Sequence, residues 1–216
     1  MFTHVFDDSQ LIQTYAQILS RLRALKNRPL IIGINGIDGA GKTTYANALS
    51  RFLLQQGHRT QVVHVDDFHN ERAIRYDGPD EASNFYHKSI NFDALETLIL
   101  KPIKSTCHLK ATLTLLDLET DTYTLRRHYD ISPTTIVIVE GVFLFKRELR
   151  AYFDLAIFLD VSFDEAVRRA RQRDTHIPVD LIEERYRKKY HAGQRLYFSN
   201  DRPLETVDIL ISQPET

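Results

Sequence analysis

The fold of this chain is decided by the stretch Gly36-Ile37-Asp38-Gly39-Ala40-Gly41-Lys42-Thr43-Thr44. Its pattern, Gly-x-x-x-x-Gly-Lys-Thr, is that of a phosphate-binding loop (P-loop), in which glycines let backbone N–H groups approach phosphate oxygens closely. We expect all of these residues to surround the phosphates of a nucleoside triphosphate. Lys42 would contact the β- and γ-phosphates, and the Thr43 hydroxyl would be a ligand of a magnesium ion.

The sequence around this loop has the order strand, loop, helix that a P-loop requires, with an apolar run at 30–34 and a helical pattern at 41–54. Four further apolar runs are typical of buried strands, and two helical stretches separate the last two of them: strands 60–65, 135–139, 155–159 and 207–211, and helices 164–174 and 179–198. This alternation predicts an α/β fold of the P-loop NTPase type. It would be a doubly wound five-stranded parallel sheet with helices on both faces.

Three segments outside this alternation have patterns of their own. Residues 8–26 repeat apolar side chains at helical spacing and predict an amphipathic first helix. Residues 109–125 alternate apolar and polar side chains around a polar break, which predicts a β-hairpin appended to the core. A helix is expected to begin near Asn91 and to stop at Pro102.

Length and composition limit the class of protein. The 216 residues, 43% of them hydrophobic, are enough for one domain spanning residues 1–216. A net charge of −1 gives no positive field that would attract a nucleic acid, and no apolar run is long enough to cross a membrane. A single cysteine, Cys107, and the lack of a signal-peptide pattern at residues 1–10 favour a cytoplasmic location. The oligomeric state stays open, and a homo-oligomer is one option.

Two carboxylates directly follow predicted strands, at the edge where the ligands of open α/β sheets bind. Asp66 follows the strand that ends at residue 65, and we expect it to orient or deprotonate an attacking hydroxyl and to contact the metal. Glu140 follows the strand that ends at residue 139, where a carboxylate would hold magnesium through a bound water. Asp67 is expected to point away from Asp66, because successive strand residues face opposite sides.

The sequence as a whole resembles the uridine kinase and phosphoribulokinase-like family, over residues 30–211. The segments that carry the resemblance are 36–44, Asp66-Asp67-Phe68-His69, Val139-Glu140-Gly141-Val142-Phe143 and 153–160. It implies a P-loop kinase that transfers the γ-phosphoryl group of ATP, or of GTP, to a hydroxyl of a small acceptor in the presence of Mg²⁺. By this resemblance Asp66 corresponds to the catalytic aspartate and Glu140 to the magnesium-associated glutamate.

The family also has an arginine-bearing lid after the fourth core strand, and residues 168–178 lie in that region. Arginines there would neutralise the charge that spreads over the transferred phosphoryl group. Arg169 and Arg173 are four residues apart and so share one face of a helix. With Lys42 and Asp66 they form the expected catalytic set.

The polar segment 68–89 is expected to select the acceptor, because long loops in compact domains are often functional. The candidate acceptor contacts in it are His69, Arg72, Tyr76, Tyr86 and Lys88. Lys88 would favour an anionic group on the acceptor. The resemblance favours a nucleoside such as uridine or cytidine. A sugar phosphate, glycerate or a pantothenate-like acid is the alternative, and a P-loop ATPase without a small-molecule acceptor is a third interpretation.

Overall fold

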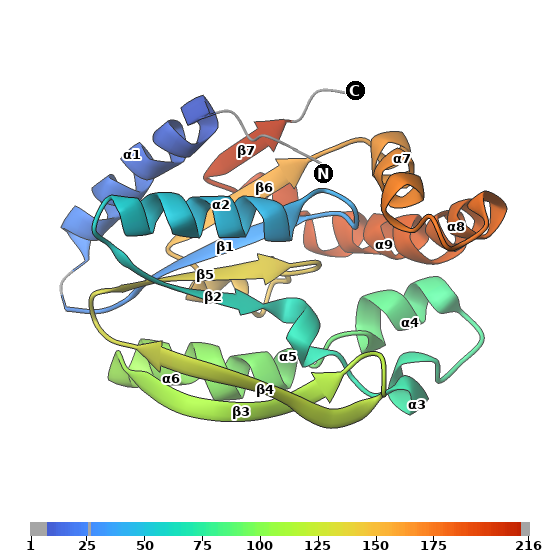
Figure 1. Ribbon diagram of the computed structural model, residues 1–216, viewed down its shortest axis with the longest axis horizontal. Helices are drawn as coiled ribbons and strands as arrows, with labels where there is room; N and C mark the ends of the chain where they lie inside the picture. The colour runs from blue at the N-terminus through green and yellow to red at the C-terminus, as the bar shows by residue number, and fades with distance from the viewer. Residues whose placement is uncertain (1–7, 26, 213–216) are drawn as a thin grey trace.

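A five-stranded, entirely parallel sheet forms the centre of the computed structural model, which describes residues 8–25 and 27–212 (Figure 1). The strands, in spatial order, are β2 Arg59–His64, β5 Thr135–Gly141, β1 Leu30–Gly36, β6 Leu155–Asp160 and β7 Ile209–Ser212. β1 and β5 are buried at every position, because helices cover both of their faces. The predicted doubly wound P-loop fold is confirmed.

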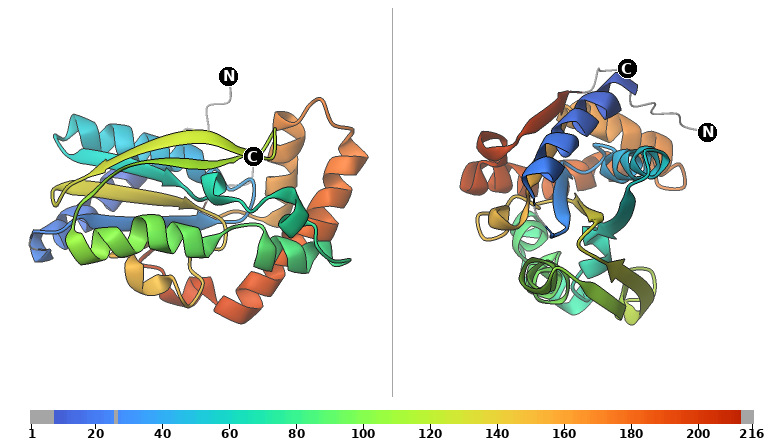
Figure 2. Two further views of the ribbon diagram at one scale, coloured as in Figure 1. Left: turned by 90° about the horizontal axis from the view of Figure 1, so that it is seen from below. Right: turned by 90° about the vertical axis from the view of Figure 1, so that its left-hand side faces the viewer.

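Helices cover both faces of this sheet (Figure 2). On one face lie α1 Asp8–Ala24, α2 Lys42–Gln55 and α7 Phe163–Arg173; on the other lie α4 Glu81–Lys88, α5 Phe92–Leu95, α6 Lys101–Thr106 and α9 His191–Asp201. The core is accordingly divided in two. Val137 packs with the second group of helices and its neighbour Ile138 with the first, since successive strand residues face opposite sides.

The segment 68–89 is more ordered than the polar loop that the sequence predicts. A 3₁₀ turn, Val65–Phe68, follows β2, and two helices come after it, α3 Arg72–Arg75 and α4. The Asp80 side chain caps α4 by accepting hydrogen bonds from the N–H groups of Ala82 and Ser83. The expectation of a continuous loop was wrong because this cap, hidden among polar residues, starts a helix.

Pro102 does not end the helix that begins after Asn91, so that prediction was also wrong. A π-helical turn, Glu96–Leu100, follows α5, and Pro102 lies in the first turn of α6. A proline is tolerated in the first turn of a helix, where its missing N–H is not needed. The helix ends instead at Cys107, whose φ angle of 59° is left-handed.

The predicted hairpin is present, with β3 Leu109–Asp117 antiparallel to β4 Thr122–Ile131. Arg127 of β4 forms two hydrogen bonds with the Asp67 carboxylate, at 2.6 and 2.9 Å. At the turn between the strands, Asp121 accepts hydrogen bonds from the Arg72 backbone N–H and the Arg75 guanidinium. The hairpin is therefore fixed to the segment that follows β2 at two points.

The helical stretch predicted at 179–198 consists of α8 Val179–Arg185, a π-helical turn, Tyr186–Tyr190, and α9, which extends to Asp201. The first helix ends at Ala24 rather than 26, and Lys26 lies outside the described residues. Among the described residues, no helix combines the length and the apolar character needed to cross a membrane. That residues 1–216 form a single domain remains a prediction.

Candidate active site

The P-loop joins β1 to α2 at the carboxyl edge of the sheet. Gly39 and Gly41 have φ angles of 80° and 84°, so the loop conformation depends on residues without a side chain. No described side chain caps α2, and its first N–H groups are available to phosphate oxygens at the positive end of the helix dipole. Lys42 Nζ donates to the Ile37 carbonyl at 2.8 Å, which holds the ammonium group against the loop.

A buried hydrogen-bond network supports the start of this loop. Asn35 Oδ1 accepts from the Gly36 N–H at 2.8 Å, and its Nδ2 donates to the Tyr197 hydroxyl at 2.5 Å. The same hydroxyl accepts from the Phe145 N–H at 2.8 Å, so Tyr197 links the P-loop strand to the segment after β5. The sequence motifs gave no sign of a role for Asn35.

Glu140, at the end of β5, lies beside the P-loop and is almost completely buried. Its Oε1 accepts a hydrogen bond from the Thr43 hydroxyl at 2.9 Å and lies 2.7 Å from His64 Nδ1. The hydrogen bond to Glu140 raises the pKa of His64, because the carboxylate favours the protonated imidazole. The predicted metal-binding pair, Thr43 and Glu140, is thus in direct contact.

These groups fit a magnesium ion of the kind that accompanies a nucleotide. The described residues include no cluster of three His, Cys, Asp or Glu side chains arranged to hold a metal alone. Magnesium in phosphoryl-transfer sites does not need one, since it takes one or two protein oxygens together with water and phosphate oxygens. The Thr43 hydroxyl and the Glu140 carboxylate supply ligand oxygens of this type. They lie close together, because the hydroxyl donates a hydrogen bond to the carboxylate. Bound Mg²⁺ would neutralise negative charge on the phosphates.

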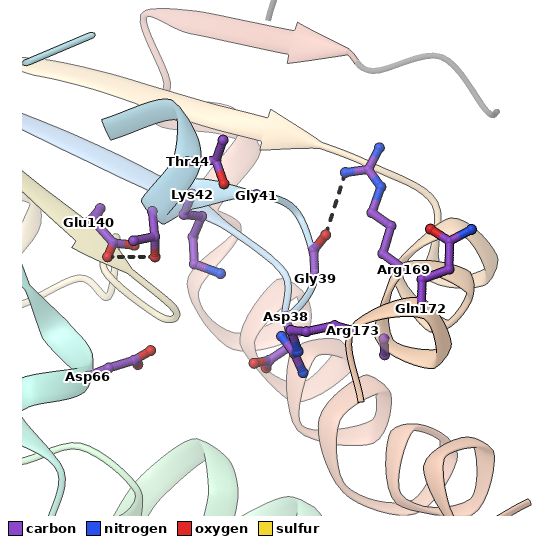
Figure 3. Close-up of a pocket in the computed structure, with 12 residues that line it drawn as sticks. Asp38, Gly39, Gly41, Lys42, Thr44, Asp66, Glu140, Arg169, Gln172 and Arg173 are labelled. Atoms are coloured by element: carbon purple, nitrogen blue, oxygen red, sulfur yellow. Dashed lines mark hydrogen bonds between the residues drawn. The ribbon is translucent and has the colours of Figure 1, made fainter. Parts of the chain in front are cut away.

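Asp66 and Asp67 follow β2 but point in different directions. Asp66 faces the same cavity as Lys42 and Glu140 (Figure 3). Asp67 is buried and is held by Arg127 of the hairpin. The residue that the sequence favoured for catalysis is therefore the one that reaches the cavity.

The cavity beside the P-loop has a volume of about 380 Å³. Its walls are Asp38, Gly39, Gly41, Lys42, Thr43, Thr44, Asp66, Glu140, Arg169, Ala170, Gln172 and Arg173. Ile37 and Ala40, also expected around the phosphates, are buried in the core, so only their backbone groups remain for that role, and Gly36 is not part of the wall. The other residues that were predicted to surround the nucleotide phosphates all line this cavity.

The two predicted lid arginines both reach this cavity from α7. Arg169 is nearly buried, donates from Nε to Glu165 at 2.7 Å, and lies 3.5 Å from the Gly39 carbonyl. Hydrogen bonds from Arg168 and Arg169 lower the pKa of Glu165 to about 2, so this carboxylate is ionised at neutral pH. Arg173 forms two hydrogen bonds with Asp174 at the end of α7. The other arginines of α7, Arg168 and Arg171, pair with Glu165 and Glu183 and do not line the cavity.

A second cavity, of about 480 Å³, adjoins the first and shares Asp38 and Asp66 with it. Its other walls are His69, Arg75, Tyr76, Phe85, Ser89, Leu118, Val142, Arg185, Lys189 and Tyr190. Asp38 of the P-loop and Asp66 thus lie where the two cavities meet. The second cavity is therefore the candidate acceptor site, and the predicted acceptor contacts His69 and Tyr76 are among its walls.

Three other predicted acceptor contacts, Arg72, Tyr86 and Lys88, are not among the described walls of either cavity. Tyr86 lies on the core face of α4, where it is almost fully buried and its hydroxyl donates to Asp201 at 2.5 Å. Lys88 pairs with the Asp77 carboxylate at 3.0 Å. The Arg72 side chain is exposed, and its backbone N–H donates to the Asp121 carboxylate.

The sequence interpretation missed Gln172 in the first cavity and Arg185 and Lys189 in the second. The last two are four residues apart in one helical stretch, and this spacing was the available signal that they share a face. This signal was hidden because two of the three positions between them are also basic, in Arg185-Tyr186-Arg187-Lys188-Lys189.

Comparisons with known proteins find relatives of this chain that are named uridine kinase. A uridine kinase from Limosilactobacillus reuteri (strain DSM 20016) is 28% identical over 152 residues, which are 68% of this chain and 66% of the relative. A uridine kinase from Lactiplantibacillus plantarum is 30% identical over 149 residues, or 68% of each chain. The match thus spans about two-thirds of the length of these relatives.

Solved structures share the fold over nearly the whole chain. The structure of a possible uridine kinase from Bacillus stearothermophilus has a TM-score of 0.70 and 27% identity, and covers 94% of this chain and 99% of its own. D-glycerate 3-kinase from Cryptococcus neoformans var. grubii has a TM-score of 0.63 at 15% identity, covers 89% and 88%, and is similar in fold alone. The phosphoribulokinase / uridine kinase family matches residues 31–177, from β1 through the loop after α7. The chain belongs to this family.

Proposed function

We propose that the chain is a small-molecule kinase that transfers the γ-phosphoryl group of ATP to an acceptor hydroxyl. The observation that carries the proposal is the pair of adjoining cavities that meet at Asp38 and Asp66. One cavity contains the P-loop and suits the donor phosphates, and the other is free for an acceptor. An ATPase without an acceptor would not need the second cavity beside its reacting group.

The transfer follows from the positions of the side chains. The acceptor oxygen forms a bond to the γ-phosphorus, the bond from that phosphorus to the β–γ bridging oxygen breaks, and ADP leaves. The hydroxyl proton passes to Asp66, which lines both cavities, and from there to solvent. Lys42, Arg169 and Arg173 line the donor cavity and supply positive charge to the transferred group.

Members of the family named uridine kinase make nucleosides such as uridine and cytidine the first acceptors to test. A sugar phosphate, glycerate and a pantothenate-like acid are the alternatives, and GTP is the alternative donor. The P-loop holds phosphates through backbone N–H groups, which do not distinguish the two bases. We propose Mg²⁺ as the accompanying ion and a cytoplasmic location.

A label-transfer assay tests the proposal. The chain is incubated with γ-labelled ATP or GTP, Mg²⁺ and one acceptor at a time, and labelled products are separated from labelled phosphate. Transfer to at least one acceptor, abolished in Lys42→Ala, is the expected result. Release of phosphate alone, at one rate with every acceptor, would contradict the proposal and favour an ATPase.

A further inference from the structure

The acceptor cavity carries negative charge at one end and positive charge at the other. Asp38 and Asp66 lie where it meets the donor cavity, and Arg185 and Lys189 contribute to its wall from the helical stretch after the lid. The cavity volume of about 480 Å³ is within the range of small-ligand sites. A ligand that fills this cavity would therefore contact both the carboxylates and the basic side chains.

At the acidic end, Asp38 offers a carboxylate oxygen that the protein leaves unused. Its Oδ2 atom is shielded from solvent and has no hydrogen-bond partner among the described residues. Burial raises the pKa of Asp38, and the ammonium group of Lys42 opposes this effect. Buried acceptors of this kind are normally satisfied, so the oxygen is suited to a hydroxyl donated by a ligand. Together with Asp66 it defines the end at which hydroxyl groups of the acceptor belong.

At the basic end, Lys189 is held by aromatic rings, and no carboxylate in the described part of the chain forms an ion pair with it. Its Nζ lies 4.9 Å from the ring centre of Tyr76, 5.4 Å from that of Tyr190 and 5.8 Å from that of Phe85. Its one hydrogen bond to a described residue is a contact of 3.4 Å with the Tyr76 hydroxyl. Contact with rings offsets part of the lost hydration of an ammonium group but leaves its charge uncompensated.

Arg185, one helical turn before Lys189, also lacks an ion-pair partner among the described residues. Other cations nearby are paired: Lys188 with Glu184, Arg171 with Glu183, and Arg75, which lines the same cavity, with Asp121. Glu81 lines the adjoining hollow of about 340 Å³ together with Arg185 and Lys189, yet it forms an ion pair with neither. Two cations at this end of the cavity are thus in no ion pair with a carboxylate of the described residues.

We infer that the acceptor is a hydroxy compound that also carries a carboxylate or a phosphate, which binds to Arg185 and Lys189 while its hydroxyl groups lie at Asp66 and Asp38. This inference rests on the proposed kinase function and names the substrate class of the same site. A charge-assisted hydrogen bond is stronger than one between neutral groups, so an anion gains more from these two cations than a neutral nucleoside does. The transfer itself is unchanged: the acceptor hydroxyl takes the γ-phosphoryl group, ADP leaves, and the proton passes to Asp66.

Matched acceptors that differ only in the anionic group test the inference. Glycerol is compared with glycerate, fructose with fructose 6-phosphate, and ribose with ribose 5-phosphate, and uridine and cytidine are added as neutral nucleosides. We expect transfer from ATP to an anionic member at a kcat/KM at least tenfold above that of its neutral partner. The glycerate and sugar-phosphate pairs distinguish a carboxylate from a phosphate as the group bound.

Variants of the two cations then locate the anion. In Arg185→Gln and Lys189→Gln we expect KM for the preferred acceptor to rise at least tenfold, with the dissociation constant of ATP changed less than twofold. Arg187→Gln is the matched control, since Arg187 lies on the same helical stretch but lines a hollow between α7 and α8. Arg185 is exposed, so its variant keeps the fold even if Lys189→Gln does not.

The outcomes separate the two proposals. Transfer to uridine or cytidine in preference to every anionic acceptor, or an acceptor KM that the two variants leave unchanged, overturns the inference and leaves the kinase function in place. An equal rise in KM for ATP and acceptor also overturns it, because the cations would then serve the donor. Failure to transfer to any acceptor overturns the kinase function and the inference with it.

Discussion

The donor cavity and the acceptor cavity meet at Asp38 and Asp66 but are built differently. Half of the wall residues of the donor cavity come from one continuous stretch, 38–44, and the others are Asp66, Glu140 and residues of α7. The acceptor cavity takes its walls from many separate segments, among them α3, α4, the hairpin turn and the π-helical turn before α9. A site made by one short motif can be recognised in a sequence, whereas a site made by distant segments needs the fold.

The two cavities also differ in how their charges are used. In the donor cavity Glu140 contacts Thr43 and His64, and Arg169 contacts Glu165. In the acceptor cavity Arg185 and Lys189 have no carboxylate partner among the described residues. The donor side is thus organised before a ligand binds, while part of the acceptor side lacks partners that a ligand can supply.

The largest effect is expected from Lys42→Ala, which removes the cation of the P-loop. Turnover should fall by roughly three orders of magnitude, because this charge acts on the transferred phosphoryl group. Steady-state transfer rates at saturating ATP and acceptor measure the loss. Lys110→Ala, an exposed lysine of β3, is the control and should retain full activity. Near-normal turnover in Lys42→Ala would show that the P-loop does not act in transfer.

Asp66→Asn should reduce kcat by roughly two to three orders of magnitude, because the amide cannot accept the hydroxyl proton. The dissociation constant of ATP should change little, since the backbone of the P-loop remains. Titration with a fluorescent ATP analogue and single-turnover transfer distinguish the two quantities. Asp93→Asn, on the exposed side of α5, is the matched control. If ATP binding were lost together with transfer, Asp66 would be structural, and the two cavities would not divide donor from acceptor.

Arg127→Ala should affect the acceptor cavity more than the donor cavity. Arg127 holds Asp67 and thereby fixes the hairpin beside the acceptor cavity. The free energy of unfolding should fall by about 1 to 2 kcal/mol. This loss is at the low end of the range for charged hydrogen bonds, because the Arg127 side chain is half-exposed and solvent screens the interaction. The acceptor KM should rise more than the KM of ATP. Urea unfolding and steady-state kinetics provide both numbers. Arg126→Ala, one residue earlier and exposed, should change neither.

The smallest effect concerns His191, at the start of α9, which packs against Phe163 and whose Nε2 has no partner among the described residues. Burial, with Arg195 adding to it, lowers the pKa of His191 to about 4. Between that value and the unfolded pKa of about 6.5, the unfolded chain binds more protons, so this histidine makes stability fall as pH falls. His191→Phe should lose about 1 kcal/mol less than the wild type between pH 8 and pH 6.

Urea unfolding at several pH values measures this difference, and pH 8 serves as the reference because the imidazole is neutral there in both states. Parallel losses of stability in the two proteins would mean that His191 is not a buried neutral group. The donor and acceptor cavities do not include this side chain, so the kinetic constants at neutral pH are expected to stay the same.

Much of the fold could be predicted from the sequence, and the predictions that were wrong have physical causes. The apolar runs gave the five strands, because strands buried on both faces contain few polar residues. The segment 68–89 was misjudged, since the Asp80 cap of α4 is one polar residue among many. Pro102 was misjudged because it falls in the first turn of α6 after a π-helical turn, where proline is tolerated.

By itself the sequence determined the P-loop and the two strand-end carboxylates, Asp66 and Glu140, because a local backbone motif and the common edge of a parallel sheet fix where they lie. Only the tertiary structure decided which side chains of segment 68–89 line the candidate acceptor cavity. Tyr86 turns into the core, Lys88 pairs with Asp77, and Arg185 and Lys189 arrive from a helix about a hundred residues further along the chain. Their direction depends on how helices pack against one another, and that packing is a property of the whole fold.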